Sequence, residues 1–303
     1  MIDFQLITPK DKAAFERLSF DGKTRGCEFT FANLFLWGRQ RMATVAGHIV
    51  LFSQFDRRTV YPFPIGNGDK KPVLDAIIAD AAERGIPCRL TGLTEPDITL
   101  LENLYPDRFH FHCDRGAYDY VYDINDLADL AGRKYQRKRN HINRFLEKYP
   151  SYAIAPLTAD NAAAVRAMLD EWYQTREQDD PTADFEMEKA ALYKALRHFE
   201  ELGMDGLVLT DGDTVLAFTL GSRLSETVFD VQFEKARAEA EGAYPMINRE
   251  MARFVRQKYP AVQYLDREED MGLEGLRKAK ESYYPHHLTE KCWAHLREDG
   301  YDY

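Results

Sequence analysis

The sequence predicts a mixed α+β fold in two similar halves, each with a mostly antiparallel sheet flanked by helices. Segments of helical and strand periodicity alternate along all 303 residues. Asp211-Gly212-Asp213, between two apolar segments, is a strong hairpin signal. The same order of elements occurs before and after the break at Tyr149-Pro150-Ser151. We therefore expect two domains, 1–150 and 151–303, although no residue-level repeat relates them.

The first half is expected to hold four helices before a basic segment. Gly85-Ile86-Pro87 ends the third helix, because glycine and proline terminate helical periodicity. The predicted helices are 9–18, 31–40, 71–84 and 95–105. The predicted strands are 44–54 with a turn at Gly47, 61–66, 89–92 and the aromatic stretch 107–124.

The second half is expected to repeat helices, a strand meander and a further helix. The predicted helices are 159–175, 185–202, 243–258 and 274–281. The predicted strands are 152–155, 206–210, 214–222, 227–234, 264–266 and 288–296. The pattern in each half is that of a sheet covered by helices.

Composition indicates a folded, cytoplasmic protein. The chain is 45% hydrophobic and 30% charged, with a net charge of -10, which argues against broad coating of nucleic acid. It has no run of about 18 apolar residues and no signal-peptide pattern at its start. The four scattered cysteines predict free thiols in a reducing compartment, not disulfides or a zinc site. The histidine pairs 110/112 and 286/287 lack further ligands at suitable spacing, so we predict no metal site.

Residues 132–148 form a cationic segment in this acidic chain. Seven of the 17 residues are Lys or Arg. At helical spacing, one side carries Lys134, Arg137, Lys138, His141 and Lys148, while Arg139 falls on the apolar side. One interpretation is a solvated surface helix. The other, which we favour, is a helix whose charges meet phosphates or carboxylates of a ligand.

Residues 264–285 combine four acids with a short basic helix. Asp266, Glu268, Glu269 and Asp270 precede Arg277, Lys278 and Lys280, and Ser282-Tyr283-Tyr284 follows. The acids could simply favour the N-terminus of the helix through its dipole. A mixed acidic and basic loop beside aromatic residues also suits a zwitterionic ligand such as an aminoacyl group.

Three further segments offer candidate chemistry. Asp230 and Glu234 share one face of the strand 227–234 and could hold an amine or act as a base, although the sequence alone favours a polar, solvent-facing edge. Arg237–Gly242 loosely fits a loop that binds pyrophosphate before a helix, although two glutamates lie inside it. Asn33 could be a helix cap or a ligand contact.

Four segments resemble a known bacterial family. They are EFTFANLFLW (28–37), YDYVYDINDLADLAGRKYQRKRNHINRF (118–145), FEKARAEAEGAYPMINREMA (233–252) and DREEDMGLEGLRKAKESYYP (266–285). The chain resembles the phosphatidylglycerol lysyltransferase C-terminal domain family, in its stand-alone soluble branch, which is similar to Fem-type aminoacyl-tRNA-dependent transferases. The resemblance implies two tandem acetyltransferase-like (GNAT-like) domains. The family's large membrane domain has no counterpart here.

Thirteen residues match the sequence pattern of this stand-alone soluble branch, although the resemblance does not imply a role for each of them. These are Asn33, Arg137, Lys138, Arg139, Asn140, Asn248, Arg267, Glu268, Asp270, Gly272, Arg277, Lys280 and Tyr283.

From the residues and the resemblance together we expect an acyl- or aminoacyl-transferase that uses aminoacyl-tRNA as co-substrate, contacts the tRNA acceptor end and has no tightly bound cofactor. The acceptor would be an amine or hydroxyl of a small molecule or lipid head group. The expected catalytic residues are Asp230, Glu234, Glu268 and Lys280. The expected donor-binding residues are Lys134, Arg137, Lys138, Arg139, Asn140, His141 and Arg277, and the expected substrate-binding residues are Asn33, Asn248, Arg267, Asp270 and Tyr283. The alternatives are an acyl-CoA-dependent N-acyltransferase and a non-catalytic module that binds an anionic metabolite.

Overall fold

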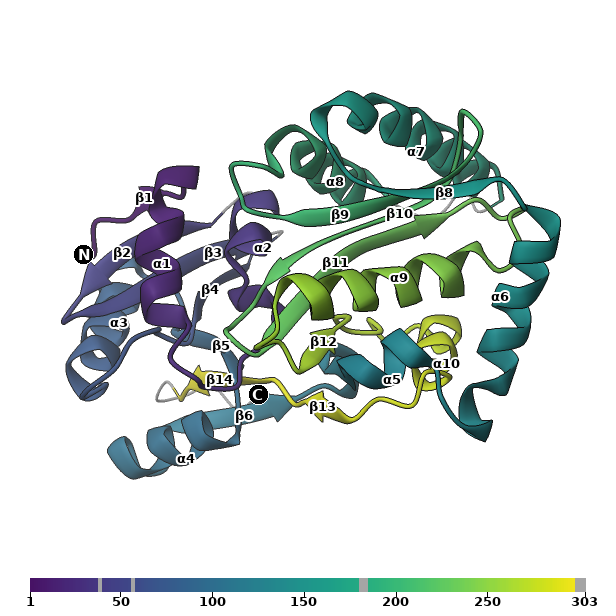
Figure 1. Cartoon of the computed structure of the whole chain (residues 1–303). Coiled ribbons are helices and arrows are strands. Elements are labelled where there is room, and N and C mark those ends of the chain that lie inside the picture. The colour runs from purple at the N-terminus through teal and green to yellow at the C-terminus, as the bar shows by residue number, and fades with distance from the viewer. Residues whose placement is uncertain (38–39, 56–57, 180–184, 298–303) are drawn as a thin grey trace. The chain divides into compact units, whose positions relative to one another are not determined.

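The computed structural model describes every residue except 38–39, 56–57, 180–184 and 298–303, and Figure 1 traces the chain. The chain forms two compact units. The first comprises residues 1–120, 268–278 and 287–303, and the second comprises residues 121–267 and 279–286. The predicted boundary between domains lies at residue 150, whereas the chain passes between the units after Tyr120, Arg267, Lys278 and His286.

The first sheet has the strand order β1-β2-β3-β4-β5-β14-β6. Its strands are β1 (Gln5–Leu6), β2 (Arg41–Val45), β3 (His48–Phe55), β4 (Arg58–Pro62), β5 (Arg89–Leu93), β6 (Phe109–Cys113) and β14 (Cys292–Leu296). The helices of this unit are α1 (Lys12–Ser19), α2 (Phe31–Leu36), α3 (Lys71–Arg84) and α4 (Glu95–Leu104). The predicted strand 44–54 is in fact part of a hairpin of β2 and β3 that turns at Ala46-Gly47, both with positive φ.

The second sheet has the order β13-β7-β12-β11-β10-β9-β8. Its strands are β7 (Asp119–Asp123), β8 (Tyr152–Pro156), β9 (Asp205–Asp211), β10 (Thr214–Arg223), β11 (Val228–Ala236), β12 (Tyr264–Asp266) and β13 (His287–Thr289). The remaining helices are α5 (Ile124–Asp129), α6 (Gln136–Lys148), α7 (Ala159–Asp179), α8 (Glu186–His198), α9 (Ala243–Lys258) and α10 (Glu274–Glu281). The predicted hairpin at Asp211–Asp213 joins β9 to β10.

The two sheets have the same internal order. Each contains one parallel pair joined by a helix: β4 and β5 through α3, and β11 and β12 through α9. The sixth position in each sheet is filled by a strand from a distant part of the chain, β14 beside β5 and β7 beside β12. The matching strand orders and parallel pairs agree with the repeated order of elements predicted from the sequence. The reciprocal exchange of β7 and β14 explains why no single cut in the sequence separates the two units.

Helices cover both faces of the second sheet. On β11, the Glu234 side chain bonds to Asn248 of α9, whereas the next residue, Lys235, pairs with Glu188 of α8. Because neighbouring strand residues point to opposite faces, α9 and α8 lie on opposite faces of the sheet. Figure 1 shows α9 running beside β11. Asp230 and Gln232 on β11 are buried, and Glu234 and Lys235 are partly buried, so the strand is not a solvent-facing edge.

The cysteine prediction was wrong for two of the four residues. Cys113 on β6 and Cys292 on β14 form a disulfide, while Cys27 and Cys88 are free and buried. The register places Cys113 and Cys292 directly opposite each other in an antiparallel pair, with their Cα atoms 4.3 Å apart. They are separated by 179 positions in the sequence, so their spacing held no sign of this pairing.

None of the described helices has an apolar stretch long enough to span a membrane. The longest, α7, has 21 residues, and charged side chains interrupt it. Across the described residues, no helix combines the length and the apolar character needed to cross a bilayer.

Candidate functional site

Asp270 holds the loop after β12 in place. Both of its carboxylate oxygens accept from Arg277, at 2.7 and 3.1 Å, and the same carboxylate accepts from the Tyr120 hydroxyl and the Gly272 amide. Asp270 is fully buried, and the bonds from Arg277, with those from Tyr120 and Gly272, hold the pKa of its carboxyl well below the usual range despite burial. Two predicted site residues, Asp270 and Arg277, are therefore partners of each other.

We expect this pairing to make the fold sensitive to acid. Because the folded-state pKa is depressed, Asp270 stabilises the fold above its ordinary pKa of about 4, and the contribution is lost as pH falls below that value. Asp270→Asn should lower the free energy of unfolding at pH 7 by about 1–3 kcal/mol. Urea unfolding between pH 7 and 3 checks this, because the variant should lose less stability than the wild type on acidification. Equal losses would contradict the assignment.

A buried lysine organises a second cluster in the first unit. We call Cys27, Glu28, Asp119, Glu269 and Lys291 the Lys291 cluster. The Lys291 ammonium lies 2.8 Å from Asp119, 3.1 Å from Glu28 and 3.4 Å from Glu269, and it donates to Cys27 Sγ at 3.6 Å. Lys291 is 6% exposed, and its carboxylate neighbours raise its pKa against the effect of burial.

The donor atoms of Cys27, Asp119 and Glu269 lie within 4.8 Å of one another, the spacing of a metal-ligand set. The Lys291 ammonium contacts all three and already supplies the positive charge that a cation would bring. Burial, followed by the charge of Asp119, raises the pKa of the Cys27 thiol, so this cysteine is not an activated nucleophile. No sequence pattern predicted this cluster, since its members are widely separated in the chain.

Two predicted site residues border the Lys291 cluster. Asn33 donates its amide to Glu268 Oε1 at 2.9 Å and to the Cys27 carbonyl at 3.0 Å. Asn33 is 5% exposed and thus fixes both the Glu268 side chain and the backbone that leads into the cluster. The structure therefore brings Asn33 and Glu268 together.

The remaining predicted residues that meet lie in the second unit. We call Lys138, Glu234, Asn248, Arg267 and Tyr283 the Arg267 cluster. Glu234 accepts from Arg267 at 2.9 Å and from Asn248 at 3.3 Å. The Arg267 guanidinium lies 5.0 Å from the centre of the Tyr283 ring, and the Lys138 ammonium lies 3.6 Å from the same ring.

The Arg267 cluster contains polar atoms without partners. Arg267 Nη1 and Asn248 Oδ1 are buried and form no hydrogen bond with any residue that the structure describes. Burial, then the nearby charges of Arg267 and Arg137, lower the pKa of Lys138 to about 8. Lys138 donates to Ser282 Oγ at 2.7 Å, and Lys280 donates to the Arg267 carbonyl. Two cations and one carboxylate thus converge on a partly desolvated position.

A shift in the strand register separates Asp230 from Glu234 on β11. Asp230 is opposite Ser222, while Glu234 is opposite Thr219, because the register between β10 and β11 shifts by one residue. Gly221 allows the close approach, since a Cβ there would stand 2.3 Å from the Asp230 carbonyl oxygen.

The basic segment forms helix α6, but most of its charges bind within the second unit. Arg139 donates to the carbonyls of Leu130 and Gly132, and Lys134 pairs with Asp126 at 2.8 Å. Backbone carbonyls thus satisfy Arg139, which was expected to bind the donor. Further along, Asn140 accepts from Gln136, His141 lies 3.7 Å from Glu241, and Lys148 donates to the Glu239 carbonyl. Arg137 is exposed and forms no ion pair within the described chain.

The loop 237–242 is occupied by neighbouring side chains. Arg237 donates to the Val215 carbonyl and pairs with Glu171 at 2.6 Å. A Cβ on Gly242 would stand 2.3 Å from the His141 carbonyl oxygen, so α6 packs directly on the start of α9. Glu239 and Glu241 add negative charge to the same loop. These features disfavour a pyrophosphate site here and, with it, the acyl-CoA alternative.

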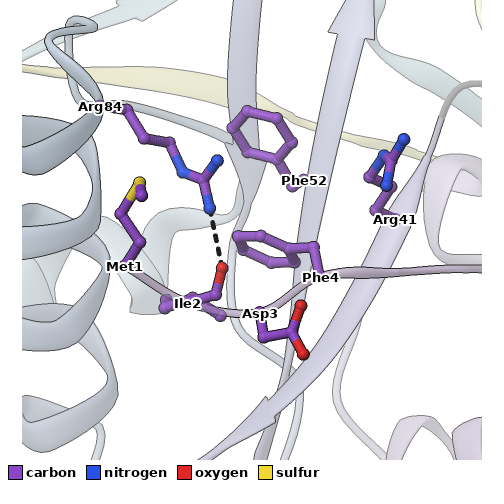
Figure 2. A pocket seen from close by; sticks show the side chains of 7 residues that line it. All are labelled: Met1, Ile2, Asp3, Phe4, Arg41, Phe52 and Arg84. Atoms are coloured by element: carbon purple, nitrogen blue, oxygen red, sulfur yellow. Dashed lines mark hydrogen bonds between the residues drawn. The ribbon is translucent and has the colours of Figure 1, made fainter.

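A pocket in the first unit holds none of the predicted site residues. Figure 2 shows Arg84 reaching across it to the Ile2 carbonyl, at 2.8 Å, beside the Phe4 and Phe52 rings. Its lining residues are Met1, Ile2, Asp3, Phe4, Arg41, Phe52 and Arg84. Arg84 is already paired with Asp80.

Comparison with known families and structures adds context to this geometry. A family model described as "Phosphatidylglycerol lysyltransferase, C-terminal" matches residues 21–295. A conserved protein of unknown function from Bacteroides thetaiotaomicron VPI-5482 is 37% identical, with a TM-score of 0.93 over 98% of this chain and 100% of that one. An uncharacterised protein of Mycoplasmoides gallisepticum is 23% identical over 57% of this chain, and the match spans 54% of that protein's length.

Two more distant structures share the fold. L-PGS from Bacillus licheniformis is 16% identical, with a TM-score of 0.69 over 97% of this chain and 94% of that chain. FemX is 11% identical, with a TM-score of 0.63 and 98% coverage of both chains. A tandem GNAT protein of the clavulanic acid pathway reaches a TM-score of 0.50 at 7% identity, covering 99% of this chain and 100% of that one. These similarities confirm the tandem acetyltransferase-like fold.

Proposed function

Because the chain belongs to the family of phosphatidylglycerol lysyltransferase C-terminal domains, we propose that it is an aminoacyltransferase whose reaction takes place at the Arg267 cluster. The donor is aminoacyl-tRNA, and the acceptor is an amine or hydroxyl of a small molecule or lipid head group. The observation that carries the proposal is the buried Nη1 of Arg267, which has no hydrogen-bond partner within the described residues. A buried donor left unpaired costs about 1–3 kcal/mol, so its retention beside a carboxylate suggests a ligand oxygen.

In this mechanism Arg267 stabilises the negative charge that develops on the ester carbonyl oxygen. Its guanidinium is held by Glu234 and by the rings of Tyr122 and Tyr283, so it needs little reorganisation during the reaction. Lys138 and the exposed Arg137 contact phosphates near the tRNA acceptor end. The pKa of about 8 keeps most of Lys138 protonated at neutral pH.

Glu234 is the base in this proposal, and Asn248 fixes its orientation. The acceptor nucleophile forms a bond to the ester carbonyl carbon while its proton passes to the Glu234 carboxylate. The ester bond to the tRNA ribose then breaks, and that oxygen takes up the proton that Glu234 accepted, which restores the Glu234 carboxylate. An aminoacyl ester is already activated, so positioning supplies much of the rate and no covalent nucleophile is required.

Filter binding of tRNA tests the donor half of this proposal. Arg137→Glu should weaken binding and reduce the slope of log affinity against log salt by about one unit, because one phosphate contact is lost. The matched control is Arg144→Glu on the same helix, where Arg144 is 64% exposed and pairs with Glu241. The control changes the net charge by the same amount and should alter affinity far less. Equal losses in both variants would indicate non-specific attraction and contradict the proposed contact.

A further inference from the structure

His48 in the first unit is a buried side chain with an unused ring nitrogen. It is 1% exposed, and its Nδ1 lies 2.9 Å from the Ala46 carbonyl oxygen. A carbonyl oxygen only accepts, so Nδ1 carries the hydrogen and Nε2 presents a lone pair. Nε2 is buried and has no hydrogen-bond partner among the residues described. Burial, together with the charges of Lys70 and Lys23, lowers the pKa of His48 and favours this neutral form.

Lys70 is a buried cation that lacks a carboxylate partner. It is 8% exposed, its ammonium donates to the Gly66 carbonyl at 2.9 Å, and it lies 5.9 Å from the centre of the Phe63 ring. No acid lies within ion-pair distance in the part of the chain that is described. Buried charges are normally paired, because desolvation of a lone ammonium is costly.

Both side chains converge on Gly66. The Lys70 ammonium binds the Gly66 carbonyl, and a Cβ on Gly66 would stand 2.9 Å from His48 Cδ2, the carbon bonded to Nε2. Residues 67–69 are exposed, which gives solvent access to this position. The backbone amides of residues 66–70 donate no hydrogen bond within the described residues.

Both cations and acids surround Lys70. Lys23 and Arg25 both act on Lys70 electrostatically, and both pair with Asp21. The nearest acid in the loop, Asp69, accepts from the Lys71 amide at the start of α3. Asp97 and Asp21 also act on Lys70, but neither lies within ion-pair distance of its ammonium. A buried cation without a contacting carboxylate favours an anionic ligand.

We propose that His48, Lys70 and the amides of residues 66–70 form a binding site for a phosphate group that carries a hydrogen. A phosphate oxygen accepts from the Lys70 ammonium and from the backbone amides, while the P–OH group donates to His48 Nε2. Hydrogen phosphate and a singly protonated phosphomonoester both meet this requirement. Sulfate, which has no hydrogen at neutral pH, does not. The site lies in the first unit and is independent of the Arg267 cluster.

Calorimetric titration of the full chain with inorganic phosphate, AMP and sodium sulfate at pH 6 tests this site, because about half of the AMP then carries the required hydrogen. We expect phosphate or AMP to bind at least about tenfold more tightly than sulfate, because sulfate leaves His48 Nε2 without a donor. Tighter binding of phosphate than of AMP would identify the free anion as the ligand, and the reverse would identify a phosphomonoester. No binding of either phosphate, or equal binding of sulfate, would overturn the proposal.

Two variants and one spectroscopic signal locate the site. Lys70→Met should weaken phosphate binding at least about tenfold, because it removes a charge-assisted hydrogen bond. Lys71→Met is the matched control, since Lys71 is exposed and pairs with Asp75 on the same helix, and it should retain wild-type affinity. If Lys70→Met fails to fold, ¹⁵N NMR of the wild-type protein shows whether phosphate binds beside His48. Bound phosphate must then shift the resonance of His48 Nε2. Equal losses in both variants, or an unshifted His48 resonance at saturating phosphate, would refute the site.

Discussion

Replacing Lys291 by Met should lower the free energy of unfolding by about 3–5 kcal/mol at pH 7. Lys291 is the ammonium that Asp119, Glu28 and Glu269 share, and Asp119 is fully buried. Without it, these carboxylates repel one another in a poorly solvated position. Urea unfolding at pH 7, followed by circular dichroism, measures the loss.

The pH dependence of this loss distinguishes charge from packing. The charge of Lys291 and the hydrogen bonds with Cys27 and Asp119 lower the pKa of the Glu269 carboxyl despite its burial. Glu269 therefore stabilises the folded wild type above its ordinary pKa, and this stabilisation is lost as the pH falls. In the variant the carboxylates take up protons readily, and the difference from wild type should shrink between pH 7 and 4. Lys278→Met, which removes an exposed lysine paired with Glu274, should cost less than about 0.5 kcal/mol. A loss independent of pH would show that Lys291 acts through packing alone.

Replacing Arg267 by Met should reduce kcat/KM for aminoacyl transfer at least about 100-fold, if the reaction takes place at this cluster. The loss arises because the developing negative charge on the ester oxygen no longer meets a positioned donor. Transfer of a radiolabelled aminoacyl group from charged tRNA to a lipid or amine extract provides the assay. Arg267→Lys should recover only part of the rate, since an ammonium cannot bond Glu234 and present a second donor in the same plane.

Arg249→Met provides a closely matched control for Arg267. Arg249 lies on α9 beside Asn248, has a side chain that is 16% exposed like that of Arg267, and pairs with one glutamate. The Arg249→Met substitution removes one positive charge from the second unit, as Arg267→Met does. It should leave kcat/KM within about twofold of the wild-type value. An Arg267→Met protein that keeps its melting temperature and its transfer rate would remove Arg267 from the mechanism.

Local sequence signals predicted individual elements well. The predicted bounds of α3, α9 and α10 agree with the structure, because amphipathic periodicity and terminal glycine or proline residues act within a few positions. Gly85, for example, ends α3 with φ 65, a conformation that glycine adopts at little cost. The loop after β12 was also recognised as unusual from its composition.

The candidate site was only partly predictable. Glu234, Asn248, Arg267, Lys138 and Tyr283 were all expected to act, and the structure brings them together. Arg139, Arg277 and Asp270 were also expected to bind ligands, but each is bound to other groups of the protein. A charge in a sequence shows that a partner is needed without showing whether that partner is a ligand or another residue.

The sequence by itself determined the mixed α/β class, the repeated order of elements and most helix boundaries, because these depend on side-chain period and on capping over short distances. Only the tertiary structure decided the exchange of β7 and β14, the Cys113–Cys292 disulfide and the Lys291 cluster. These features join residues more than a hundred positions apart. Their proximity follows from which strands pair, and strand pairing is set by the packing of the whole chain rather than by any local pattern.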